Sequence, residues 1–236
     1  MSHMHIPDGV LPVWLVTAGW LAAALILAFC IKKVDGTDLK RKIPLLGIIS
    51  ALMIVGMTLE IVPIAYHINL TVVAGIVLGP SLAFIAVFIV DLLISMLGHG
   101  GVTVVGLNTI IIGAEAVLGY YLFQLFRQVM RNKSMFWESS LAALLSLFLS
   151  TSIMLGVVYL SHVSPEKIGN VGHLISGAGG GTDALHNAGS GINFPRFAKT
   201  VFILSPLGWI LESAITGLVI KYVFRVRPDL IMQERA

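Results

Sequence analysis

Residues 10–31 read VLPVWLVTAGWLAAALILAFCI, a run without a single charged side chain. An α-helix rises about 1.5 Å per residue, so roughly 20 apolar residues cross the bilayer's hydrocarbon core of about 30 Å. The run therefore predicts a membrane-spanning helix. It is longer than the apolar core of a removable signal sequence, and no lysine or arginine precedes it, so we expect it to be retained.

The whole chain has the same apolar character. Of its 236 residues, 57% are hydrophobic and 11% are charged, against about 25% charged residues in an average soluble domain. So few charges cannot cover a soluble body of this size, and lipid must cover much of the surface. The basic residues stand in short clusters between apolar runs rather than along one face, which argues against nucleic-acid binding. The single cysteine, Cys30, excludes an intrachain disulfide and a thiolate metal cluster.

Further apolar runs predict an all-α membrane protein, a bundle of about seven transmembrane helices. A short run at 69–78 ends at Gly79-Pro80, where proline can open the next helix but cannot continue the previous one. We expect the chain to turn there inside the protein, because a backbone break at membrane depth must be buried. Residues 10–236 then form one transmembrane domain with a mobile, glycine-rich outer loop at about 161–200. The other predicted spans are 43–61, 81–97, 106–126, 138–160 and 201–224.

The basic residues predict the orientation of the bundle. Short loops on the cytoplasmic side of a membrane are rich in lysine and arginine. With seven crossings, only Lys167, Arg196 and Lys199 fall on the opposite side from all the others. The N-terminus is therefore expected outside and the C-terminus in the cytoplasm. The basic residues on the cytoplasmic side are Lys32, Lys33, Lys40, Arg41, Lys42, Arg127, Arg131, Lys133, Lys221, Arg225, Arg227 and Arg235.

The histidines fall entirely on the predicted outer side. One such histidine is ordinarily a solvated side chain, but the group points to a metal, because neutral imidazole suits nickel, cobalt, copper and zinc. A free N-terminal amine, the following amide nitrogen and the imidazole of the next residue can together close a flat chelate on one metal ion. One further imidazole, for which His67 is the best candidate, completes a square that favours Ni(II) or Cu(II) over tetrahedral zinc. The seven are His3, His5, His67, His99, His162, His173 and His186.

Three segments resemble one family. MHIPDGVLP at residues 4–12 resembles the opening of the NikM/CbiM family, the substrate-binding subunits of energy-coupling-factor nickel and cobalt transporters. YHINL at 66–70, continuing to LGP at 78–80, and GG at 100–101 followed by GLNT at 106–109 resemble later segments of the same family. The resemblance covers most of residues 4–128. The Pro7-Asp8 pair resembles the nickel branch more closely, which slightly favours nickel over cobalt.

The resemblance implies a seven-helix subunit of the prokaryotic plasma membrane whose N-terminal loop, residues 1–9, enters the bundle to bind the metal. Met4, through its amine, His5 and His67 would be the ligands. Asp8 and Gly9 would shape the loop, and Asn108 would lie among the residues that hold it. The ion would be Ni(II) or Co(II), carried as the transported substrate, with no organic cofactor.

The chain departs from the family pattern at its start. Met1-Ser2-His3 precede the methionine that matches the family's first residue. If these residues are retained, Met4 has no free amine, and the family's chelate cannot form unchanged. The amine of Met1, the amides of Ser2 and His3 and the imidazole of His3 then offer four nitrogens in one plane. Both chelates stay open at this point.

A row of alanines in the first span suggests close contact with another helix. Residues four apart lie on one face, and small side chains there let helix backbones approach. Packing within the bundle is one explanation. The resemblance implies the other, which is docking on a transmembrane coupling subunit whose partners are cytoplasmic ATPases; a small accessory membrane subunit is a further candidate partner. The alanines are Ala18, Ala22, Ala24 and Ala28.

Four acids lie within apolar runs, where ionisable groups are costly and often functional. We expect Glu60 and Glu212 to bond to neighbouring polar groups or to interfacial water. Asp91 and Glu115 are deeper, and we expect them to share a proton or to line a cavity.

The leading hypothesis is therefore a subunit that binds and translocates a metal, and not an enzyme. The chain has no Walker sequence, so ATP-driven transport needs partners. The alternative is an intramembrane metallohydrolase with His67, Asp91 and Glu115 around zinc, although no HExxH helix or serine nucleophile elbow is present. A structural membrane scaffold is the third possibility, and it leaves the placement of the histidines unexplained.

Overall fold

The structure is a computed structural model that describes residues 6, 8–9, 11–34, 36–58, 67–98, 100–131, 134–162 and 194–231, with the backbone alone for 36–41, 162 and 194–197. Within these ranges the chain is helical and contains no strand, so the all-α bundle of seven α-helices is confirmed. The elements are α1 (Val13–Lys33), α2 (Gly36–Thr58), α3 (Thr71–Leu78), α4 (Pro80–Met96), α5 (Val105–Val129), α6 (Met135–His162), α7 (Phe194–Val226) and a final 3₁₀ turn, η4 (Pro228–Leu230).

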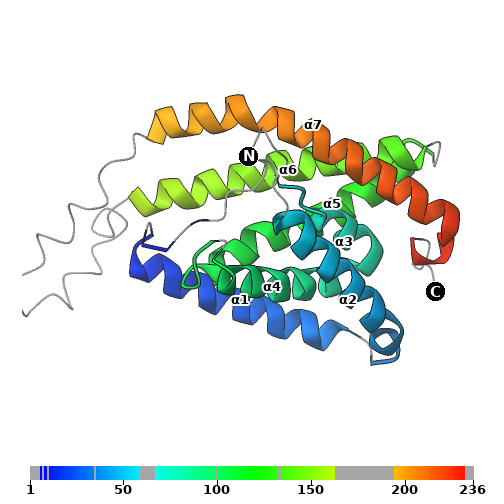
Figure 1. Cartoon of the computed structure of the whole chain (residues 1–236), viewed down its shortest axis with the longest axis horizontal. Helices are drawn as coiled ribbons and strands as arrows, with labels where there is room; N and C mark the ends of the chain where they lie inside the picture. Colours follow the sequence, from blue (N-terminus) through cyan, green and yellow to red (C-terminus); the bar gives the residue numbers. More distant parts are fainter. Residues whose placement is uncertain are drawn as a thin grey trace, which may run out of the picture.

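Four of the described helices are long and apolar enough to cross a membrane: α1, α5, α6 and α7. Helices α2 and α4 contribute shorter apolar segments. Figure 1 shows α6 and α7 side by side along one edge of the molecule and α1 along the opposite edge, with the other helices between them.

Three helices begin three to seven residues earlier than predicted. Helix α2 begins at Gly36 and α6 at Met135, both earlier than the apolar runs. Helix α7 begins at Phe194, inside the range predicted as loop. The first two turns of α2 are mostly polar and escape a search for apolar residues, because backbone hydrogen bonds continue a helix beyond its apolar part. That reason does not apply to α6, which opens on Met135, Phe136 and Trp137. The rest of the predicted loop, 163–193, lies outside the described residues.

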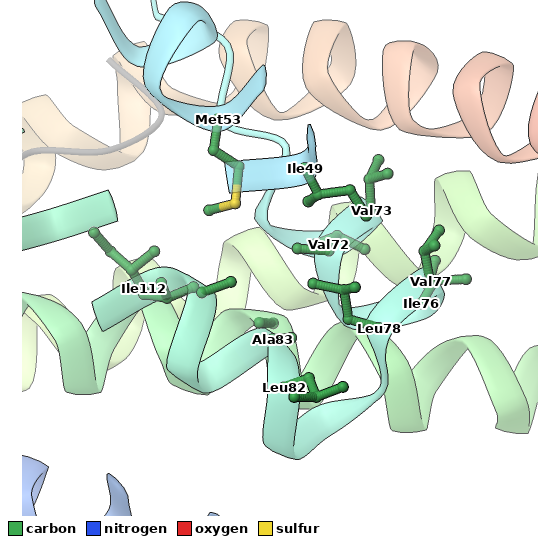
Figure 2. Packing of buried hydrophobic residues seen from close by; sticks show 14 of the residues in the cluster. Ile49, Met53, Val72, Val73, Ile76, Val77, Leu78, Leu82, Ala83 and Ile112 are labelled. Carbon is green, nitrogen blue, oxygen red and sulfur yellow. The ribbon is translucent and has the colours of Figure 1, made fainter. Parts of the chain in front are cut away.

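Helix α3 occupies the centre of the larger core. All its eight residues are buried, and Figure 2 shows its valine, isoleucine and leucine side chains beside Ile49 and Met53 of α2. The helix stops at Gly79, whose φ of 79° favours glycine, and Pro80 opens α4. Both backbone polar groups of Gly79 are hydrogen-bonded at the break. Its N–H donates to the Gly75 carbonyl, and its carbonyl accepts from the Ala83 N–H, each at 3.0 Å. The predicted turn at Gly79-Pro80 is present, and both residues are half-buried.

The two ends of the bundle differ in character. Figure 1 places the start of α1, the α4–α5 connection, the end of α6 and the start of α7 at one end, which we call the loop end. The end of α1, the start of α2, the end of α5 and the end of α7 meet at the other, which we call the basic end. Basic side chains complete the last turns of three of these helices: Lys32 and Lys33 of α1, Arg127 of α5 and Arg225 of α7.

Candidate metal-binding site

The N-terminal loop is bonded to the start of α5 at Ile6, the residue after the predicted ligand His5. The Ile6 N–H donates to Asn108 Oδ1 at 3.2 Å, and Asn108 Nδ2 donates to the Ile6 carbonyl at 3.4 Å. Both residues are buried, so these bonds form away from water and replace hydration that the peptide has lost. The Ile6 side chain packs in a second core cluster that includes Leu11, Leu15 and Leu107.

A second attachment lies two residues further on, at Asp8. Its carboxylate accepts hydrogen bonds from the Val102 N–H at 3.1 Å, from the Thr103 N–H at 2.9 Å and from the Thr103 hydroxyl. The hydroxyl bond is the main reason why the pKa of the Asp8 carboxyl lies below its ordinary value of 3.8. The loop is therefore fastened to the α4–α5 connection by a charged carboxylate.

Glycines allow this approach. Gly9, in the turn after Asp8, has a φ of 81°, a conformation that side chains rarely adopt. On the other side of the contact, a Cβ atom at Gly101 would collide with the backbone and carboxylate of Asp8.

His67 belongs to a short non-helical segment between α2 and α3. The next residue, Ile68, donates its N–H to the Gly56 carbonyl of α2 at 3.2 Å. Asn69 is buried, and its Oδ1 accepts from the N–H of Thr71, the first residue of α3, at 3.1 Å and from the Thr71 hydroxyl, which forms an Asx turn before the helix. His67 itself is half-buried and its Nδ1 atom is inaccessible to solvent. The backbone on its C-terminal side is thus fixed to two helices.

The proposed ligand set is only partly within the described residues. Met1, Ser2, His3, Met4 and His5 lie outside them. Among the described residues, no three His, Cys, Asp or Glu side chains gather closely enough to hold a metal ion. The N-terminal chelates therefore stay predictions.

The hydrolase alternative needs His67, Asp91 and Glu115 around one zinc ion, and all three are described. They form no metal-holding group. Asp91 of α4 accepts a hydrogen bond from the Thr109 hydroxyl of α5 at 3.0 Å, and Glu115 of α5 accepts one from the Ser150 hydroxyl of α6 at 2.8 Å. These carboxyl groups join neighbouring helices, and the hydrolase alternative is not supported.

The remaining acids lie as follows. Glu212 is buried in α7, whereas Glu60 lies outside the described residues. The sequence analysis missed Glu138, which is completely buried and accepts the Ser134 N–H at 3.3 Å at the start of α6. In the sequence, Ser134, four residues before Glu138, was the signal that could have indicated this bond.

The predicted docking alanines lie on α1. Ala18, Ala24 and Ala28 are exposed and Ala22 is half-buried, so most of these alanines are not covered by the described part of the chain. Sequence analysis also missed Trp20 and Thr103. The Trp20 Nε1–H donates to the Thr103 carbonyl at 2.7 Å, and no local pattern in the sequence marks either residue.

Together these observations define a multi-pass helical membrane protein whose N-terminal loop is bonded across the start of α5. The chain belongs to the CbiM family, described as the cobalt uptake substrate-specific transmembrane region, whose model matches residues 5–230. A protein of Haloquadratum walsbyi described as a metal transport protein is 28% identical over 98% of this chain and 94% of its own length. The cobalt transport protein CbiM of Geobacter sulfurreducens is 29% identical over 97% of this chain, which spans 61% of that protein.

Solved structures share the fold. A crystal structure of a truncated transition metal transporter superposes with a TM-score of 0.73 at 21% identity, over 94% of this chain and 99% of that one. A second transition metal transporter gives a TM-score of 0.71 over 94% and 93% of the two chains. The family resemblance and the multi-pass membrane prediction are confirmed, and the chain is a component of metal uptake.

Proposed function

We propose that this chain is the substrate-binding subunit of an ATP-driven, energy-coupling-factor uptake transporter, and that it captures Ni(II) or Co(II). The observation that carries the proposal is the pair of hydrogen bonds between Ile6 and Asn108. They fix the backbone of Ile6, the residue after the predicted ligand His5. A preorganised ligand loses less conformational freedom on binding.

The ligands we assign are the Met4 amine, the amide and imidazole nitrogens of His5, and the His67 imidazole. A planar set of four nitrogens suits Ni(II) better than Zn(II), which prefers a tetrahedron. The family description names cobalt, and we therefore keep both ions as substrates. If Met1, Ser2 and His3 are retained, a chelate formed by them is the competing arrangement.

The basic end supports the proposed orientation, with the loop end outside and the basic end in the cytoplasm. The metal would then enter on the side of the N-terminal loop. The exposed alanines of α1 leave a face that a transmembrane coupling subunit can approach. ATPases bound to that subunit would supply the energy for release inside.

Metal titration tests the proposal. The full chain and a chain beginning at Met4 are each purified and titrated with Ni(II), Co(II), Cu(II) and Zn(II). His67→Ala is compared with His186→Ala, which removes a histidine that the proposal does not use. In the chain beginning at Met4, we expect nickel or cobalt affinity to fall more than about 100-fold in His67→Ala, beyond the usual loss for a residue that only supports a ligand, and to stay unchanged in His186→Ala.

Two results would contradict the proposal. One is equal nickel and cobalt binding by His67→Ala and His186→Ala in the chain beginning at Met4. The other is the absence of nickel and cobalt binding by that chain. Uptake of radioactive nickel or cobalt by cells that also make the partner subunits tests the transport step, and it should stop when the partner ATPases are inactivated.

A further inference from the structure

A chain of hydrogen bonds runs from α1 to the N-terminal loop. The Trp20 indole N–H donates to the Thr103 carbonyl at 2.7 Å, and Thr103 in turn donates its N–H and its hydroxyl to Asp8. Thr103 therefore uses three polar groups to bind the N-terminal loop and α1, both of which are distant from it in sequence. Among the described residues of the loop, none is hydrogen-bonded to the Trp20 side chain directly.

Trp20 is well fixed at its own position. Its ring meets Phe88 of α4 edge-on, with centroids 6.5 Å apart and planes at 85°, a favourable arrangement for two aromatic rings. Its backbone lies directly against α5, where a Cβ atom at Gly106 would stand 2.7 Å from the Trp20 Cα. A movement of α1 at this point must therefore displace the first turn of α5 and the α4–α5 connection before it.

Helix α1 is the least buried of the four long apolar helices. Only 22% of the apolar window of α1 is buried, against 44 to 50% for α5, α6 and α7. Helix α1 is thus open to a neighbour along most of its length, while Trp20 binds it to the connection that holds Asp8.

We infer that Trp20 and Thr103 are positioning residues for the metal-binding loop, and that they connect the position of α1 to the retention of the bound ion. This inference rests on the proposed function. When Trp20 withdraws from Thr103, the α4–α5 connection loses its hydrogen bond to α1, and Thr103 then holds Asp8 less firmly. The bound ion then leaves faster.

The rate of nickel dissociation from the chain beginning at Met4 tests this inference. Trp20→Phe removes the indole donor but keeps a ring against Phe88, and Trp14→Phe is the matched control on the same helix. Thr103→Val removes the hydroxyl at nearly constant shape, and Thr103→Ser restores it. One hydrogen bond corresponds to about a twofold to tenfold change in an equilibrium or rate. We expect Trp20→Phe and Thr103→Val to speed dissociation by that factor, and Trp14→Phe and Thr103→Ser to leave it near the wild-type rate.

A double-mutant cycle separates positioning from general stability. If Trp20 acts through Thr103 on Asp8, adding Trp20→Phe to Asp8→Asn has little further effect on the dissociation rate, whereas independent effects multiply. Multiplying effects, or equal rates for Trp20→Phe and Trp14→Phe, would overturn the inference while nickel binding by the wild type still supports the proposed function. Failure of the wild type to bind nickel or cobalt would overturn both.

Discussion

Asp8 is exposed to solvent, yet its two carboxylate oxygens accept three hydrogen bonds from Val102 and Thr103. Bonds to an ionised acceptor are stronger than those between neutral groups. With Ile6 held by Asn108 on the buried side, the loop has one attachment in water and one in the core. The printed bonds of both attachments join residues that are not predicted ligands, so both are expected to act on metal binding through geometry.

Replacing the carboxylate should weaken metal binding without removing a ligand. Asp8→Asn keeps one acceptor oxygen and loses the charge, and we expect roughly 10-fold weaker nickel or cobalt binding, the lower end for residues that support a ligand. The measurement is a titration beside Asp229→Asn, a control at the opposite end of the chain. Unchanged affinity in Asp8→Asn would show that the loop does not depend on this attachment.

The lowered pKa of Asp8 predicts how the difference in metal affinity between the wild type and Asp8→Asn depends on pH. A carboxyl whose pKa is lowered in the folded protein contributes fully above its ordinary value, and the contribution disappears as the pH falls through the folded value. The ordinary value is 3.8, so the ratio of wild-type to Asp8→Asn affinity should stay constant between about pH 8 and pH 5. Protonation of the histidines weakens both proteins equally. A ratio that changes severalfold in this interval would contradict the assignment.

At the scale of elements, α3 is a short helix with no exposed face. It lies at the junction of α2, α4 and α5, directly after the segment that carries His67. Gly75 permits the closest approach, because a Cβ atom there would overlap the Ala116 carbonyl of α5. Backbone atoms of two helices cannot separate without moving the core around them.

Gly75→Ala should therefore destabilise the protein, by about 1–3 kcal/mol as for other overpacked cores. Gly156→Ala is the matched control, since nothing lies within 4 Å of a Cβ at that position of α6, and there alanine should be neutral or stabilising by up to about 1 kcal/mol. Thermal unfolding in detergent measures both. Equal melting temperatures for the two variants would mean that α3 and α5 are not in the contact described.

At the scale of the whole molecule, the distribution of charge distinguishes the two ends. Lys32, Lys33, Arg127 and Arg225 end three helices at the basic end, where cations are also favourable beside the negative ends of helix dipoles. The aligned dipoles account for only a small preference, whereas the membrane's insertion machinery selects orientation by such clusters.

Cysteine labelling in intact cells measures that orientation. In a Cys30→Ser background, Val102→Cys places a thiol in the exposed α4–α5 connection, and Arg227→Cys places one after α7. We expect a membrane-impermeant maleimide to label the first in intact cells and the second only after permeabilisation. The reverse result would invert the proposed orientation and place metal capture on the cytoplasmic side.

The sequence by itself determined the class of protein and most of its helices. Hydrophobic length is a sum over neighbouring residues, so runs such as 10–31 are recognisable without knowledge of their partners. Gly79-Pro80 is equally local, because φ restrictions and a missing N–H act within one turn. Asn108 could be named only through the family resemblance, since nothing in its own neighbourhood indicates a partner in the N-terminal loop.

Only the tertiary structure decided which polar groups meet. Ile6 and Asn108 are 102 positions apart, and Trp20 and Thr103 are 83 apart. Such pairs depend on the rotation and depth of each packed helix, which the sum of apolar residues leaves undetermined. The same reason explains why Asp91 and Glu115 bond to hydroxyl groups on neighbouring helices instead of joining His67 around a metal.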